Sequence, residues 1–186
     1  MKGKIFNAQE VQVIIAGNKT QFSEVIKFSN SKTTRDFQEI ALKKILEGFS
    51  EYNVCLSDLF KVPYQVGQEI FCKESFEIWD DGLVYKADNS PANIVCKWKP
   101  AQHMQQEHSR LTLQITGIRV ERLQSIGCTD FFADTGRRPI SHMDLDCDTP
   151  DPRNDFKVYW NATHKKPEER FEANPFVFVY SFGVTT

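Results

Sequence analysis

Apolar residues at alternate positions predict the strands of this chain, most clearly between residues 110 and 122. The apolar face runs from Leu111 to Ile115 and resumes at Ile118 with the opposite parity. One added residue near Gly117 would produce that change, because a β-bulge shifts the side-chain alternation of a strand and bends it.

Shorter patterns predict the remaining strands. Turn residues at 63–67 precede one of them, and the C-terminal strand is apolar on both faces, which favours a central place in the sheet. The predicted strands cover residues 5–6, 68–76, 83–86, 94–98 and 176–182.

Two helices are predicted in the first fifty residues. Asn7 with Glu10 three residues later forms a capping-box pattern, and Gly17 is placed to end the first helix. Residues 33–50 repeat apolar side chains at helical spacing over a wide face. Such a face is buried against the body of the domain or against a partner, and we expect the first.

Length and composition favour one domain over residues 1–186. A hydrophobic fraction of 40% supports a sizeable core, and the polar stretch 135–170 is predicted to be an excursion with few core residues. The formal net charge of -2 gives no general affinity for phosphate backbones, so binding of nucleic acid would need a local basic patch.

The five cysteines have wide, irregular spacing and the four histidines do not cluster with them, so we expect reduced thiols and no metal site. No apolar run is long enough to span a bilayer, and the first residues lack the apolar core of a signal peptide. These features predict a cytoplasmic protein with no membrane partner. No sequence feature indicates a cofactor.

Four short signatures together resemble the ASCH family of the PUA-like superfamily, in the form carried by many phage and prophage genomes. They are Gly17-Asn18-Lys19-Thr20, Pro63-Tyr64-Gln65-Val66-Gly67, Trp98-Lys99-Pro100 with His103-Met104, and Ala173-Asn174-Pro175-Phe176. The resemblance implies an α+β fold: a small PUA-like β-barrel of about 5–7 mostly antiparallel strands flanked by 2–4 helices. Residues 31–60 would then be a helical insertion.

Bacterial relatives that remove the acetyl group from acetylated cytidine use a lysine, a threonine and an acidic residue. Lys19 matches the lysine, but Phe22 stands where the family has the threonine nucleophile, and a phenylalanine ring cannot attack a carbonyl. Ser23 is the nearest replacement, although neighbouring residues of a strand point to opposite faces. If the protein is an enzyme, the resemblance implies Lys19 and Asp134 as catalytic residues, and we expect Ser23, or else Thr20, to act with them.

The resemblance also implies a set of ligand-binding residues. Trp98 would stack on a base or lie in the core, and Arg110 would contact a phosphate or pair with Glu74. The complete set is Lys19, Thr20, Lys73, Glu74, Ser75, Trp98, His103 and Arg110.

Three functions follow as hypotheses. The first, which we favour, is a non-catalytic module that binds RNA or a modified nucleotide. The second is an accessory phage protein that binds a host protein, for example a defence inhibitor. The third is an amidohydrolase that acts on nucleosides resembling acetylated cytidine.

Overall fold

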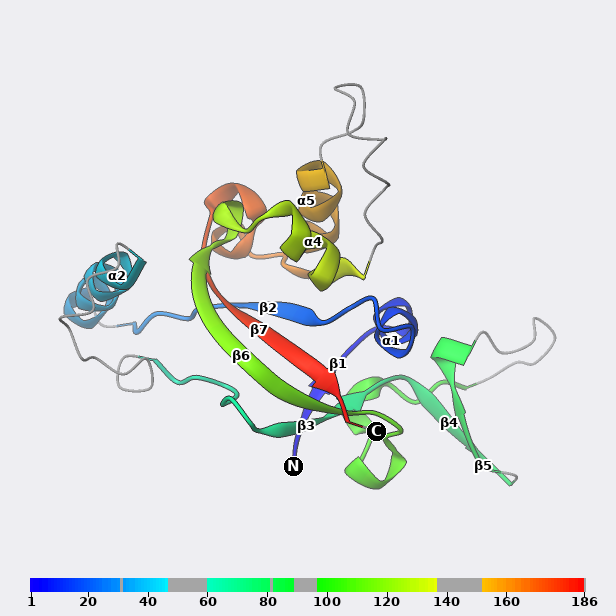
Figure 1. Ribbon diagram of the computed structural model, residues 1–186. Coiled ribbons are helices and arrows are strands. Elements are labelled where there is room, and N and C mark those ends of the chain that lie inside the picture. Colours follow the sequence, from blue (N-terminus) through cyan, green and yellow to red (C-terminus); the bar gives the residue numbers. More distant parts are fainter. Residues whose placement is uncertain (31, 47–59, 81, 89–96, 137–151, 186) are drawn as a thin grey trace.

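A computed structural model describes residues 1–30, 32–46, 60–80, 82–88, 97–136 and 152–185. It has a mixed α+β architecture with a five-stranded curved sheet and a separate two-stranded hairpin (Figure 1). The predicted α+β class is confirmed. The main elements are β1 (Lys2–Ile5), α1 (Ala8–Ile15), β2 (Gln21–Val25), α2 (Lys32–Leu46), β3 (Glu69–Lys73), β4 (Phe76–Trp79), β5 (Gly82–Tyr85), β6 (Thr112–Arg122), α4 (Cys128–Thr135), α5 (Pro152–Thr163) and β7 (Phe176–Val184).

The five-stranded sheet has the order β1-β3-β6-β7-β2. Only the β1–β3 pair is parallel; the three other pairs are antiparallel. The predicted bulge is confirmed, because the β6–β7 register shifts between Ile115 and Gly117. β7 pairs on both sides, as its two apolar faces predicted.

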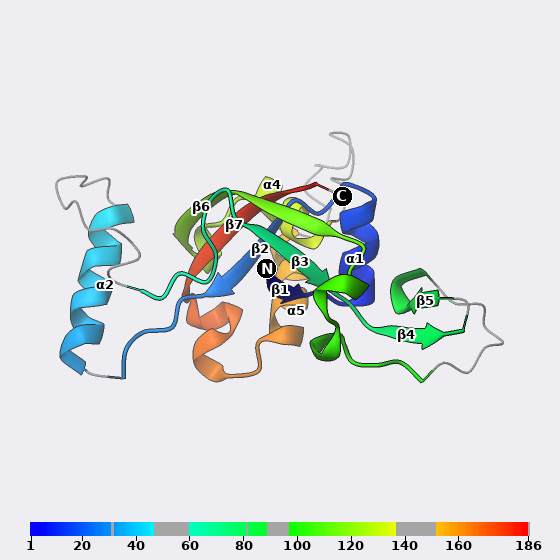
Figure 2. The ribbon, with the colours of Figure 1, turned by 90° about the horizontal axis from the view of Figure 1, so that it is seen from below.

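The two edges of this sheet, β1 and β2, lie next to each other (Figure 2). An ion pair between Lys4 on β1 and Glu24 on β2 joins them, but no backbone pairing between them is found in the part of the chain that the structure describes. The closed barrel implied by the family resemblance is therefore not found among these residues. We call the gap between β1 and β2 the seam.

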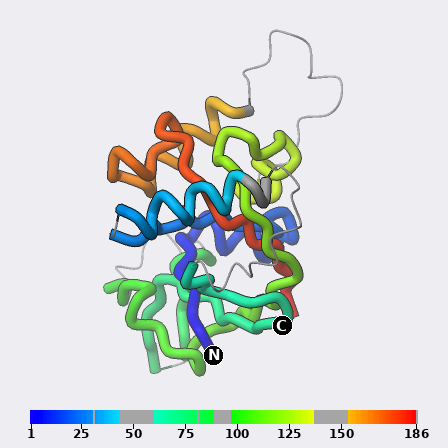
Figure 3. The backbone as a smooth tube through the Cα atoms, turned by 90° about the vertical axis from the view of Figure 1, so that its left-hand side faces the viewer, coloured from blue at the N-terminus to red at the C-terminus, as the bar shows by residue number. Residues whose placement is uncertain are grey.

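Side chains from the two faces of the sheet pack into two apolar clusters. Phe22, Phe178 and Tyr180 belong to the larger cluster, whereas Val177 and Val179, which alternate with them on β7, pack beneath α4 and α5. Figure 3 shows α4 and α5 on one side of the sheet and the β4–β5 hairpin at the opposite end.

Part of the predicted polar excursion 135–170 is instead core. Phe156 and Trp160 on α5 are fully buried, and Phe156 stacks on Phe131 of α4 with 4.5 Å between ring centroids. The prediction of few core residues is wrong for α5, because the polar composition of the whole stretch hides a short apolar helix face formed by Phe156, Tyr159 and Trp160. Residues 137–151 lie outside the described part.

Helix α2 agrees with the predicted helix over its described length. Leu42 and Gln38 are buried, but Phe37 and Ile40 expose more than half of their surface. Burial of the whole apolar face against the body of the domain is therefore not observed.

Two predicted strands differ from the structure. The stretch 68–76 is divided into β3 and β4, which belong to different sheets. Most of 94–98 lies outside the described residues, and neither Lys97 nor Trp98 is in a strand.

Candidate functional site

A half-open cleft of about 410 Å³ lies between the seam and the helical layer. β2 contributes one wall, α5 and the segment after it contribute another, and α4 contributes Asp134. Its lining residues are Lys4, Ile5, Phe6, Glu10, Phe22, Ser23, Glu24, Val25, Lys27, Asp134, Tyr159, Trp160, Thr163, His164 and Glu169.

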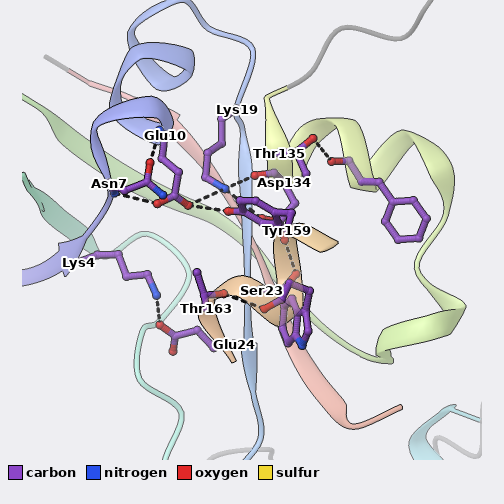
Figure 4. Close-up of polar contacts among 12 residues, drawn as sticks. Lys4, Asn7, Glu10, Lys19, Ser23, Glu24, Asp134, Thr135, Tyr159 and Thr163 are labelled. Atoms are coloured by element: carbon purple, nitrogen blue, oxygen red, sulfur yellow. Dashed lines mark hydrogen bonds and ion pairs between the residues drawn. The ribbon is translucent and has the colours of Figure 1, made fainter. Parts of the chain in front are cut away.

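A chain of polar contacts runs from the cleft into the interior (Figure 4). The Ser23 hydroxyl donates to Asp134 Oδ2 at 2.7 Å, and Lys19 Nζ donates to Asp134 Oδ1 at 3.0 Å. Lys19 Nζ also donates to the backbone carbonyl of Asp134. The three residues proposed for catalysis are thus brought together, although they come from different elements.

The Lys19 ammonium group is buried and surrounded by acceptors. Glu10 Oε1 lies 3.5 Å from Lys19 Nζ, and Tyr159 donates its hydroxyl to the same Glu10 oxygen at 2.7 Å. Burial, followed by the nearby charges of Glu10 and Asp134, raises the pKa of Tyr159. Tyr159 therefore stays a neutral donor, and the Lys19 ammonium group lies between two carboxylates.

The alternation of β2 decides which side chain reaches the cleft floor. Phe22 packs into the aromatic core, stacked on Tyr180 with 5.0 Å between ring centroids. Ser23 points to the opposite face, where Asp134 and Lys19 lie. The aromatic ring at the family's nucleophile position forms part of the cleft wall and leaves the cavity open.

Gly136 sets the position of Asp134 relative to α1. It ends α4 with a φ of 71°, and a Cβ at this position would collide with Val13 of α1. A glycine at this helix end therefore lets α4 approach α1, which brings Asp134 to Lys19.

We expect Gly136→Ala to lower the free energy of unfolding by about 1–3 kcal/mol, because it combines left-handed strain with a clash at Val13. Chemical denaturation measures the change. Gly183→Ala is the matched control, since no atom lies within 4 Å of its added Cβ. Equal stability of the two variants would contradict the close approach of α4 to α1.

The outer cleft is aromatic and mostly acidic. Trp160 stacks on His164 with ring centroids 3.9 Å apart, and its indole NH donates to the Glu169 carbonyl at 2.8 Å. Four carboxylates and two lysines line the cavity. Each carboxylate has a lysine partner: Lys19 contacts Glu10 and Asp134, Lys4 contacts Glu24, and Lys166 contacts Glu169. The cleft therefore has no excess of cations and favours neutral ligand groups over phosphates.

The predicted pair Glu74 and Arg110 is formed and lies outside the cleft. Arg110 Nε and Nη2 donate to the two Glu74 oxygens at 2.9 and 3.1 Å, and Nη1 donates to Asp88. Burial raises the pKa of Glu74, and the Arg110 contacts oppose that change. Of the two roles considered for Arg110, the geometry supports pairing, because its donors are used on protein carboxylates.

The other predicted ligand residues do not line the cleft either. Lys73 donates to the Gln102 carbonyl at 3.1 Å, and Ser75 accepts a backbone bond from Lys86. The remaining residues differ in exposure: Trp98 is half-buried, and Thr20 and His103 are exposed.

Several cleft residues were missed by the sequence prediction. Glu10 was interpreted only as part of a helix cap, which it is, but its other oxygen contacts Lys19 and Tyr159. The spacing of Phe156, Tyr159 and Trp160 is helical and would have indicated a buried helix face. Nothing local to the sequence indicated that this helix meets β2.

These features define a small α+β protein with a curved sheet, an open seam and a half-open polar cleft. Among the described residues no helix is long and apolar enough to cross a membrane. No group of three or more His, Cys, Asp and Glu side chains within that part is arranged to hold a metal ion.

A scan against protein-family models and a search of curated proteins return no match to this chain. Among solved structures, the chain is similar to protein EF3133 from Enterococcus faecalis V583, described by the family model DUF984. The alignment covers 100% of this chain and 81% of that chain, with 9% sequence identity and a TM-score of 0.44. A likeness at this level supports no conclusion about fold or function.

Proposed function

We propose that this protein is a non-catalytic binding module and that its cleft holds the nucleoside part of a nucleotide or RNA ligand. The observation that carries the proposal is the open cavity of about 410 Å³ above the Ser23–Asp134 hydrogen bond. This volume lies in the range of ordinary small-ligand sites.

The chemistry of the walls suits a base that carries an amino group. Carboxylates such as Glu24 accept hydrogen bonds from the exocyclic amines of cytosine and adenine. Ser23 and Thr163 add hydroxyls, and the ring of His164 offers a flat surface for stacking. The acidic balance favours the base and sugar over a phosphate in this cavity.

The same contacts disfavour hydrolysis. A lysine that activates a hydroxyl must contact it to take its proton, but Lys19 Nζ is engaged by the carboxylates of Glu10 and Asp134. Ser23 donates to Asp134 rather than to a lysine amine. This arrangement supports a structural role for Lys19, holding Asp134 in place beneath the ligand.

Calorimetric titration with cytidine, N4-acetylcytidine and adenosine tests the proposal. We expect binding of at least one of them, weakened about tenfold or more by Thr163→Phe, whose ring would fill the mouth of the cleft. Val158→Phe is the matched control, because Val158 is 71% exposed on the same helix and does not line the cavity. Absence of binding, or equal binding by the two variants, would refute the proposal.

The convergence of Ser23, Asp134 and Lys19 makes an amidohydrolase the second candidate. Release of acetate from N4-acetylcytidine by the purified protein, lost in Ser23→Ala, would establish it. We expect no release above the uncatalysed rate. Turnover that depends on Ser23 would overturn the non-catalytic assignment without affecting the location of the site.

Exposed Phe37 and Ile40 on α2 favour the remaining alternative, a host-protein partner. The facing edges of the curved sheet also support the PUA-like barrel as a proposal for the fold family. Neither a host-protein partner nor the fold family changes the result that we expect when the cleft is titrated with nucleosides.

A further inference from the structure

A second cavity, of about 520 Å³, opens on the same seam. It is lined by Lys2, Gly3, Glu24, Val25, Ile26, Lys27, Phe60, Lys61, Pro63, Tyr64 and Phe178, and we call it the basic hollow. It shares Glu24, Val25 and Lys27 with the cleft. The two cavities are therefore neighbours.

The two cavities lie end to end along the seam. Residues 2–3 of β1, residues 24–25 of β2 and residues 26–27 after it line the basic hollow, whereas residues 4–6, 22–25 and 27 line the cleft. The Lys4–Glu24 ion pair lies between them, with both side chains partly exposed. At the rise of a strand, Lys2 to Phe6 is roughly 13 Å, which is longer than one nucleoside.

The charge of the basic hollow is opposite to that of the cleft. Three lysines face one glutamate, and Lys27 and Lys61 are exposed and make no ion pair with any described residue. Lys2 donates to the Pro63 carbonyl at 2.7 Å, which fixes its ammonium group at the hollow. Such a group of ammonium donors is suited to a phosphate.

The floor of the basic hollow is aromatic. Phe60, Tyr64 and Phe178 are buried, and Phe60 meets Phe178 edge to face with 6.3 Å between ring centroids. Burial, then the charge of Glu24, raises the pKa of Tyr64 to about 12, so this wall is neutral at physiological pH. Aromatic rings beside ammonium groups suit a base attached to a phosphate.

We propose that the seam binds two successive nucleotides of a single strand, one nucleoside in the cleft and the next phosphate and nucleoside in the basic hollow. This inference rests on the proposed function and specifies its ligand as a dinucleotide unit rather than a free nucleoside. The acidic cleft selects the base, and the lysines supply affinity for the phosphate that follows it.

The test compares cytidine with the dinucleoside monophosphate CpC by calorimetry in 50 mM NaCl, a concentration that preserves phosphate contacts. We expect the wild-type protein to bind CpC at least about tenfold more tightly than cytidine, and 200 mM NaCl to reduce this gain. Lys61→Glu should reduce the gain to less than about twofold and leave the affinity for cytidine unchanged, because Lys61 lines only the basic hollow.

Lys86→Glu is the matched control, since Lys86 is exposed and lines neither cavity. Three results would overturn the dinucleotide inference. They are an equal loss of CpC affinity in the two variants, equal binding of CpC and cytidine by the wild-type protein, and inorganic phosphate that binds as tightly as CpC. Binding of cytidine would leave the proposed function intact in these cases. Failure of every nucleoside to bind would refute the proposed function itself.

Discussion

Lys19→Ala is expected to lower the free energy of unfolding by about 3–5 kcal/mol, because it leaves Asp134 and Glu10 without their shared cation. The Lys19 side chain is fully buried, so water does not replace the lost contacts. For a chain of this length the melting temperature should fall by about 10 °C. Calorimetric melting at neutral pH measures it.

A variant of similar size without the charge identifies the cause of this loss. Lys19→Met keeps most of the buried side chain but removes the cation, so it should lose nearly as much stability as Lys19→Ala. Lys86→Ala, at an exposed position, should change stability by less than about 0.5 kcal/mol. Wild-type stability of Lys19→Met would show that lost packing, not charge, is responsible.

Phe22→Thr restores the hydroxyl at the family's nucleophile position, and we expect a destabilised protein without hydrolase activity. The ring contacts Tyr180 face to face and Tyr64 edge to face, so the loss should be about 3–5 kcal/mol, as for other truncations of buried aromatic residues. The new hydroxyl would lie in the aromatic core, on the opposite face of β2 from Asp134.

Urea denaturation and an acetate-release assay on N4-acetylcytidine check the two parts of this prediction. Phe37→Thr is the matched control, because Phe37 is 57% exposed on α2 and should tolerate the same change within about 0.5 kcal/mol. Acetate release by Phe22→Thr would mean that the hydroxyl at position 22, rather than that of Ser23, faces Asp134 and Lys19.

Patterns among neighbouring residues were sufficient to predict the features that local interactions produce. The capping box of Asn7 and Glu10 and the bulge before Gly117 were predicted from a few neighbouring residues and are confirmed. The central position of β7 also followed, because a strand that is apolar on both faces needs cover on both.

Errors arose where a pattern had to be placed in three dimensions. The stretch 135–170 was predicted to have few core residues, yet Trp160 on α5 is buried against the sheet. Phe37 on α2 was expected to be buried and is exposed. Periodicity identifies an apolar face, but it does not say which surface covers that face.

For the candidate site too, local features were predicted and features that depend on the tertiary structure were not. The alternation rule applied to β2 correctly separated Phe22 from Ser23, but the prediction treated the position of Phe22 as the one that faces the chemistry. In the structure Asp134 and Lys19 lie on the Ser23 side. The resemblance to the ASCH family pointed to Lys19 and Asp134, whereas Glu10 and Tyr159 became visible only in three dimensions.

The sequence by itself determined the helix cap, the bulge and the central place of β7, because each follows from a pattern among residues close along the chain. Only the tertiary structure decided that α5 closes one side of the cleft, that β1 and β2 remain facing edges, and that Lys19 is held by two carboxylates. Some of these contacts join residues far apart along the chain, as in the Lys19–Asp134 pair, whose members are 115 positions apart. Local periodicity does not predict such contacts, because they depend on how the whole sheet curves and on which helices pack against it.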